Sequence, residues 1–155
     1  ADAEYRQPVE VALRKKNRKL IHNAELVCYP PGSFYSSLVA NLLPKGVADA
    51  IASNRSPKVY IPNLEQDPEQ LGMTMDSSIQ TLLRYLHQGG GKKYNNGDFL
   101  NFVLLDSGHG SYLDRPSAAL MEELGIQQIE TKLVSKSSAP YYDSRRLASA
   151  LLSLT

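Results

Sequence analysis

Three serines and a glycine gather in a short segment directly after two consecutive prolines. The segment holds Gly32, Ser33, Ser36 and Ser37. Glycine lets the backbone approach a ligand closely, and serine hydroxyls donate hydrogen bonds to phosphate oxygens. A strand-to-helix turn also points backbone N–H groups at one spot, at the positive end of the helix dipole. The segment therefore predicts a phosphate- or nucleotide-binding loop.

The same pattern has a second interpretation. Serines at the start of a helix also cap its orphan N–H groups, and a Gly/Ser loop of this kind is then only a helix cap. Asn41 follows on the predicted helix, four and five positions after Ser37 and Ser36. Its amide could hydrogen-bond the loop from within or reach a ligand, and the sequence leaves both roles open.

Further polar candidates follow two other apolar runs. Asn63 comes directly after the run 58–62, where it could point into a cleft or cap the next turn. Asp67 could bind a metal or a ribose, whereas Glu69 is interpreted as part of an exposed acidic turn. Asp106 and His109 follow the strongest apolar run and predict a polar binding loop. Members of a Ser-His-Asp triad come from separate loops, so adjacent residues do not indicate a hydrolase.

Metal, thiol and aromatic chemistry receive less support from the sequence. No histidines, cysteines or acids show metal-ligand spacing, so no metal site is predicted in this chain. Cys28, the single cysteine, falls in a predicted strand and indicates a packed thiol. Tyr141 and Tyr142 precede the last helix, where a tyrosine could stack on a nucleobase or pack into the core. Asp143 is the predicted N-cap of that helix.

Strands and helices are expected to alternate along the chain. Strands are predicted near 25–29, 58–62, 100–105 and 128–134, and helices over 7–20, 36–43, 46–54, from 75 or 76 onward, 117–124 and 144–154. Asp76 is the expected N-cap of the helix that begins at 75 or 76, and Gly125 is the expected C-cap of the helix over 117–124. Residues 89–98 are expected to form a mobile loop. This alternation predicts an α/β, Rossmann-like three-layer sandwich with a mostly parallel sheet.

The predicted topology gathers four loops at one edge of the sheet. Right-handed crossovers bring the carboxyl ends of parallel strands together, and ligands bind beyond that edge. The loops 30–37, 63–74, 106–114 and 135–143 should meet there. They carry all of the candidate residues named above except Asn41.

Several blocks resemble one known family in the same order. The segment PPGSFYSSLVANLLPKGVADAI, the strand-Asn segment KVYIPN with QDPEQ after it, and the closing YYDSRRLA resemble the CofD-like family of 2-phospho-L-lactate transferases and YvcK-like proteins. The resemblance implies phospholactyl-type transfer from a guanosine diphosphate donor in one branch, and nucleotide-sugar binding by a regulatory protein in the other. The second branch matches the residues around Tyr35 and Asn41 better. A nucleotide or nucleotide-linked small molecule is therefore the implied ligand.

The family's opening glycine loop and its acidic metal-binding segment have no counterpart here. We therefore expect residues 1–155 to form a single α/β domain that resembles the C-terminal half of a CofD-like protein. Mg²⁺ is implied for the complete protein, and this chain alone is expected to be inactive as a transferase. The alternative is a non-catalytic interaction or regulatory module.

Composition sets further bounds. The chain has 155 residues and a net charge of +1. It has no apolar run of membrane-spanning length, so we expect a cytoplasmic protein with no membrane partner. The sequence leaves open whether the protein forms a homo-oligomer. The run 14–19 is strongly basic and could bind phosphate backbones. We interpret it as a solvated helix end whose cations suit the negative pole of the helix dipole, so a nucleic-acid partner is not expected.

Overall fold

Four parallel strands form the centre of the molecule. The structure, a computed structural model, describes residues 9–91 and 93–155. The strands β1 (Val27–Tyr29), β2 (Lys58–Tyr60), β3 (Phe102–Asp106) and β4 (Gln127–Thr131) lie side by side in chain order. Cys28 pairs with Val59, Tyr60 with Val103, and Leu104 with Ile129. The α/β fold with a parallel sheet is thus confirmed.

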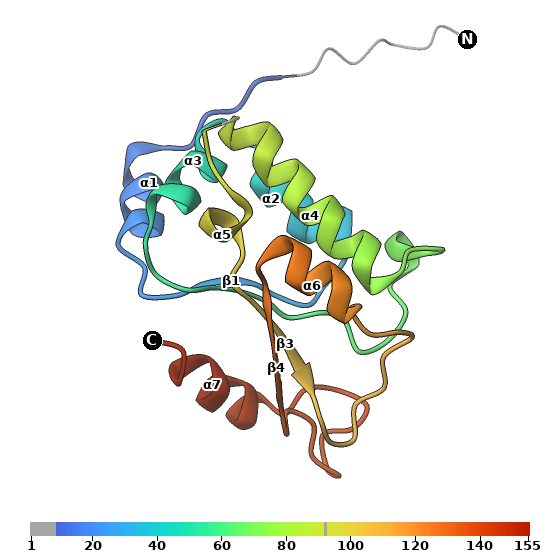
Figure 1. Ribbon diagram of the computed structural model, residues 1–155. Helices are drawn as coiled ribbons and strands as arrows, with labels where there is room; N and C mark the ends of the chain where they lie inside the picture. Colours follow the sequence, from blue (N-terminus) through green and yellow to red (C-terminus); the bar gives the residue numbers. More distant parts are fainter. Residues whose placement is uncertain (1–8, 92) are drawn as a thin grey trace, which may run out of the picture.

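Helices cover the two faces of the sheet unequally (Figure 1). They are α1 (Lys15–His22), α2 (Ala40–Leu42), α3 (Val47–Ser53), α4 (Met75–Gly90), α5 (Asn96–Phe99), α6 (Ala118–Leu124) and α7 (Ser144–Leu152). A π-helix, η1 (Phe34–Val39), runs into α2, and a 3₁₀ turn, η2 (Pro68–Gln70), precedes α4. The larger core lies between the sheet and α3 to α6, whereas α7 lies against the opposite face.

Alternation along the strands divides the apolar residues between these two cores. Val103 and Leu105 belong to the larger core, together with Leu82 and Leu86 of α4. Leu104 faces the other way, into a small core that α7 covers with partly buried side chains. Successive side chains of a strand point to opposite faces, so a continuous apolar run can supply both cores at once.

The caps of the later helices are mostly as the sequence predicts. Gly125 ends α6 with a φ of 69° and Asp143 caps α7, as predicted, whereas Ser117, predicted as the first helical residue, is the N-cap and accepts a hydrogen bond from the N–H of Leu120. The predicted N-cap of α4 was wrong: Thr74 caps it in a capping box, and Asp76 instead accepts a hydrogen bond from the N–H of Ser117 at 2.8 Å.

The N-terminal helix was predicted too long. Residues 7 and 8 lie outside the described residues, and the helix begins at Lys15. Val9 and Val11 are 83% and 58% exposed and are not on an inner face. The segment before α1 is extended, because the N–H of Lys45 donates to the carbonyl of Val11 at 2.8 Å and so draws it alongside residue 45. β-Branched valines also disfavour helix.

The predicted loop over 89–98 was also wrong in part. α4 continues through Gly90, and α5 starts at Asn96. The strands β1 and β2 are shorter than predicted, and β3 and β4 are displaced. β3 begins later because Phe99 ends α5, and β4 ends earlier because residues 133 and 134 leave the ladder to bind Asp106. Gly89 and Gly90 belong to the helix, and a Cβ at Gly90 would lie only 2.8 Å from the Phe99 ring and 3.0 Å from the Tyr94 ring, so this close approach favours glycine.

Asp49 ties α1 and the 93–94 segment to α3. Its carboxylate accepts hydrogen bonds from Tyr94 Oη at 2.6 Å, Lys93 Nζ at 2.9 Å and Arg18 Nη1 at 3.2 Å. Hydrogen bonding by Lys93, and then by Tyr94, lowers the pKa of Asp49 to about 2.

We expect this cluster to add stability that acid removes. Because the folded-state pKa of Asp49 is depressed, its contribution is present above about pH 4 and is lost as the pH falls toward 2. The groups are partly exposed, so the contribution is about 1 kcal/mol or less. Urea unfolding at pH 7, 4 and 2.5 should show a smaller loss between pH 4 and 2.5 in Asp49→Asn than in the unmodified protein. Equal losses would contradict the assignment.

Candidate functional site

Three loops enclose a cleft at the carboxyl edge of the sheet. The cleft has a volume of about 490 Å³ and is lined by residues 31–33 after β1, 63–67 after β2 and 141–142 before α7. It lies where ligands bind in open α/β sheets. Four predicted residues meet there, namely Gly32, Ser33, Asn63 and Asp67, together with Tyr141 and Tyr142. Ser36, Ser37, Asn41, Asp106 and His109 do not line it.

The predicted phosphate loop leads into a π-helix instead of a regular α-helix. The N–H groups of Ser37 and Leu38 both donate to the carbonyl of Ser33, at 3.0 and 3.1 Å. Single π turns occur often at functional sites. Ser33 makes no side-chain cap, and its side chain is exposed at the cleft. Its hydroxyl is therefore accessible to a ligand.

Two carboxylates from the chain itself occupy the start of η1. Asp67 Oδ2 accepts from the N–H of Phe34 at 2.6 Å, and Glu69 Oε2 accepts from Tyr35 and Ser36 at 2.7 and 2.9 Å. Hydrogen bonding by Ser36, through its side chain and then its backbone, lowers the pKa of Glu69. The sequence suggested that Glu69 is only part of an exposed acidic turn. In the structure it also accepts hydrogen bonds from the backbone at the start of η1. The backbone donors expected to face a phosphate are held by anions of the protein.

Asn63 clamps the glycine of the loop. Its Oδ1 accepts from the Gly32 N–H and its Nδ2 donates to the Gly32 carbonyl, both at 2.8 Å, with a further bond from Nδ2 to Gln70 at 3.1 Å. Gly32 has a φ of 146°, which residues with a side chain rarely adopt. The clamp and the glycine together fix the turn beside Ser33, so Asn63 lines the cleft and positions its wall.

Asn41 is bound inside the helix. Its amide nitrogen donates to the carbonyl of Ser37 at 2.5 Å, one turn earlier. The structure therefore shows the internal contact of the two roles that the sequence left open.

Asp106 holds two loops together from the interior. Its Oδ2 accepts from the N–H groups of Gly108 and Gly110 at 2.8 and 2.7 Å. Its Oδ1 accepts from Leu133 and Val134 at 2.6 and 2.8 Å. The residue is 1% exposed. Burial alone would raise the pKa of Asp106, but these four backbone donors outweigh it and hold that pKa below its ordinary value.

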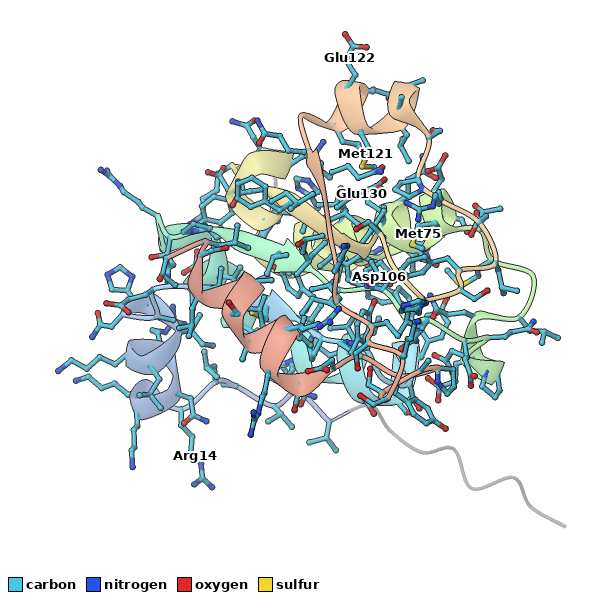
Figure 2. The ribbon with its side chains drawn as sticks, turned by 90° about the horizontal axis from the view of Figure 1, so that it is seen from below. Arg14, Met75, Asp106, Met121, Glu122 and Glu130 are labelled. Carbon is cyan, nitrogen blue, oxygen red and sulfur yellow. The ribbon has the colours of Figure 1, made fainter. Side chains whose placement is uncertain are left out.

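This arrangement removes Asp106 from the list of candidate ligand-binding groups, because all of its lone-pair positions face inward. Figure 2 shows its side chain in the interior of the molecule. His109 lies at the exposed tip of the same loop, where no contact links it to the cleft. The polar loop predicted after the third strand therefore has a structural role beside the cleft.

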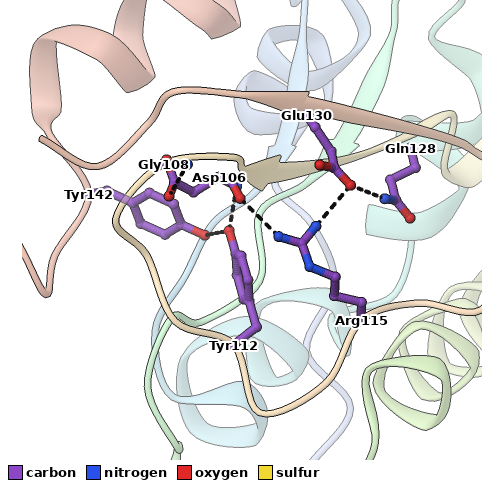
Figure 3. A network of polar contacts seen from close by, with 7 residues as sticks. All are labelled: Asp106, Gly108, Tyr112, Arg115, Gln128, Glu130 and Tyr142. Atoms are coloured by element: carbon purple, nitrogen blue, oxygen red, sulfur yellow. Dashed lines mark hydrogen bonds and ion pairs between the residues drawn. The ribbon is translucent and has the colours of Figure 1, made fainter.

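A chain of hydroxyl groups connects that loop to the cleft (Figure 3). The N–H of Asp106 donates to Tyr112 Oη at 2.7 Å, Tyr112 and Tyr142 share a bond of 3.0 Å, and Tyr142 Oη donates to the carbonyl of Pro62 at 2.6 Å. Tyr142 thereby anchors the cleft wall. Tyr141, in contrast, is 68% exposed, so its ring is available for stacking.

Sequence reasoning missed the participation of Tyr112 and Arg115. Arg115 donates to Glu130 at 2.8 Å and to the Asp106 carbonyl at 3.2 Å, which fastens the 106–115 loop to β4 (Figure 3). No local motif marks these residues. Only an unexplained tyrosine and arginine in a loop after the strongest strand could have drawn attention to them.

The part of the chain that the structure describes does not assemble a metal site. Among residues 9–91 and 93–155, no three His, Cys, Asp or Glu side chains are grouped to hold an ion. Asp67, at the cleft, and Glu69, on the adjoining η2 turn, already bind backbone N–H groups. The Mg²⁺ implied by the resemblance therefore finds no ligand set here.

Among the described helices, none has both the length and the apolarity that crossing a membrane requires.

Comparison with known proteins identifies the family of this chain. The model of a family described as 2-phospho-L-lactate transferase CofD matches residues 2–139. A gluconeogenesis factor of Listeria monocytogenes is 28% identical over 156 residues, which cover 97% of this chain and 47% of that protein. A putative gluconeogenesis factor of Thermotoga maritima is 38% identical over 69 residues, or 44% of this chain and 22% of that protein.

Solved structures share the fold. A UPF0052 family protein from Bacillus halodurans superposes with a TM-score of 0.70 at 21% identity, over 91% of this chain and 47% of that one. A second structure of the Bacillus halodurans protein gives a TM-score of 0.73, over 94% and 49%. The chain thus spans about half or less of the length of these relatives. Since the family model matches most of its residues, this chain belongs to the CofD family.

Proposed function

We propose that this chain is a nucleotide- or phospho-ligand-binding domain whose ligand occupies the cleft at the carboxyl edge of the sheet. One observation carries the proposal: the cleft places the Gly32-Ser33 turn and the exposed ring of Tyr141 on its walls. A turn with an accessible hydroxyl suits a phosphate, and an exposed aromatic ring suits a base. The volume of about 490 Å³ falls in the usual range for small-molecule sites.

The phosphate would bind beside Ser33 and compete with Glu69. Ser36 and Ser37 belong to the same turn of η1, and the backbone donors there become available when the Glu69 carboxylate withdraws. Glu69 lies at the surface on the short η2 turn, so its withdrawal requires no core rearrangement. Gly32 and Asn63 keep the turn in shape during this exchange.

Transfer chemistry is proposed only for a complete protein. The family description supports a phospholactate-type transferase, whereas the relatives are named gluconeogenesis factors, and this chain spans 47% of the Listeria protein. The residues described here bind and orient a ligand, and no step of a transfer reaction is assigned to them.

A second candidate is a regulatory or interaction module without a ligand. The capture of the η1 backbone donors by Asp67 and Glu69 favours it, since a helix whose start is already satisfied needs no phosphate. The two functions differ in whether a nucleotide binds at all.

Calorimetry with UDP, GDP and UDP-glucose separates them. We expect at least one of these ligands to bind, Ser33→Ala to weaken it several-fold through loss of a charge-assisted hydrogen bond, and Tyr141→Ala to weaken it about tenfold through loss of stacking worth roughly 1–3 kcal/mol. Ser149→Ala, an exposed serine on α7 outside the cleft, is the matched control. Failure of all three ligands to bind the unmodified chain would favour the interaction module.

A further inference from the structure

A second hollow, outside the cleft, is lined largely by the aliphatic parts of basic side chains. It lies between α1 and α3, has a volume of about 430 Å³, and is lined by Lys15, Arg18, Lys19 and His22 of α1 with Ala50 and Ser53 of α3. The four α1 residues follow the spacing i, i+3, i+4, i+7, which places them on one face of the helix. A face at this spacing next to a neighbouring helix is normally apolar. Here every position on it carries a basic side chain.

The placement of these charges is unfavourable for the helix itself. Lys15 and Lys16 lie in the first turn, at the positive pole of the helix dipole, and Arg14 stands at the N-cap without making a cap. Only Lys19 and His22 lie in the last turn, where cations stabilise a helix. The interpretation of the run as a helix end with suitably placed cations therefore accounts for less than half of it.

The basic groups are also largely uncompensated. Within the described ranges, Arg18 is held by Asp49 at 3.2 Å, and no ion pair involves Lys15 or Lys19. Residues 14–22 contain five lysines and arginines and no acid, although the whole chain carries a net charge of only +1. Like charges this close repel one another, and an anion between them would relieve that repulsion.

The shape of the hollow favours a small ligand over a long one. Its volume is that of a small-molecule pocket, and α3 contributes only the small side chains of Ala50 and Ser53 to the wall. No aromatic side chain lines it, so a nucleobase has nothing to stack on. The long lysine stems can lie along the wall while their ammonium groups converge on an anion.

We propose that the hollow between α1 and α3 is a second, independent binding site for a small soluble polyphosphate anion. Lys15 and Lys19, one helical turn apart, bind the phosphate oxygens, and Arg18, fixed by Asp49, provides a preoriented guanidinium. The site shares no lining residue with the cleft at the sheet edge.

The test measures binding of inorganic tripolyphosphate to the full chain by amide chemical shifts in NMR, with calorimetry for affinity. Shifts are expected to concentrate in α1 and α3. Lys15→Gln/Lys19→Gln should weaken this binding at least tenfold. The control Arg14→Gln/Lys16→Gln also removes two positive charges from this segment, but neither residue lines the hollow. This control should weaken the binding of tripolyphosphate less than threefold.

Several results would overturn the proposal. They are absence of shifts in α1 and α3, equal losses in the two double variants, or a single-stranded RNA 12-mer that binds more tightly than tripolyphosphate and is weakened equally by both. The last result would identify a diffuse nucleic-acid surface. Thermal unfolding of each variant checks that the fold is retained, which is expected because α1 has no fully buried residue. Binding of UDP or GDP at the sheet edge is unaffected by either outcome.

Discussion

Asp106→Asn is expected to lower the free energy of unfolding by about 3–5 kcal/mol, the range for breaking a buried charged network. The carboxylate accepts four backbone N–H groups, two from its own loop and two from residues 133 and 134. Asparagine keeps the shape but turns an NH₂ group toward two of those donors. At least two buried N–H groups then lose their acceptor, and the loss is not recovered from water because the site is closed.

Urea unfolding at pH 7 measures this loss, with Asp143→Asn as the control. Asp143 also accepts two backbone N–H groups, but at an exposed helix start, where asparagine caps as well as aspartate. The control should lose less than about 0.5 kcal/mol. Equal losses in the two variants would mean that the four contacts of Asp106 contribute no more than an ordinary cap.

Glu69→Gln is expected to tighten binding of UDP about tenfold. The carboxylate of Glu69 occupies the N–H groups of Tyr35 and Ser36, and its charge repels an incoming phosphate. The neutral amide binds those donors more weakly and removes the repulsion, so a phosphate displaces it more readily; a tenfold gain corresponds to about 1.4 kcal/mol.

The control for this variant is an acid on the wall of the cleft, four positions earlier in the chain. Glu65 lines it and carries the same charge, but no hydrogen bond joins its carboxylate to η1 among the described residues. Glu65→Gln should change the affinity less than threefold. If calorimetry finds the affinity of Glu69→Gln unchanged or reduced, Glu69 is a helix cap alone and the phosphate does not bind at η1.

The features that sequence predicts best are those set by neighbouring residues. Ser117, Gly125 and Asp143 end or begin helices through contacts within a few positions, and their types alone indicate the role. The alternating pattern likewise predicts the parallel sheet, because β1 to β3 are short, mostly apolar runs and the segment around β4 alternates apolar and polar residues. Strand ends were less exact, since they depend on tertiary contacts such as those of residues 133 and 134 with Asp106.

The roles that sequence missed depend on partners far along the chain. Glu69 binds backbone groups more than thirty positions earlier, and Asp106 binds residues 133 and 134. An isolated acid in a loop gives the same sequence pattern whether its side chain is exposed or is buried against backbone N–H groups. The position of the cleft was predicted, because the rule that carboxyl ends of parallel strands meet at one edge requires no side-chain detail, but the expected loop 106–114 does not line it.

The order of the strands has a consequence for how the molecule assembles. Each strand pairs with the one that precedes it in the chain, so every new parallel pair closes only one intervening connection. The sheet can therefore grow in the direction of synthesis, one strand and helix at a time, without waiting for a distant segment. α7 is different, because it packs across a surface that includes Val59 of β2, Leu104 of β3 and Leu133 just after β4. That surface exists only once β4 is in place, and until then the apolar side chains of its whole face stay in contact with water.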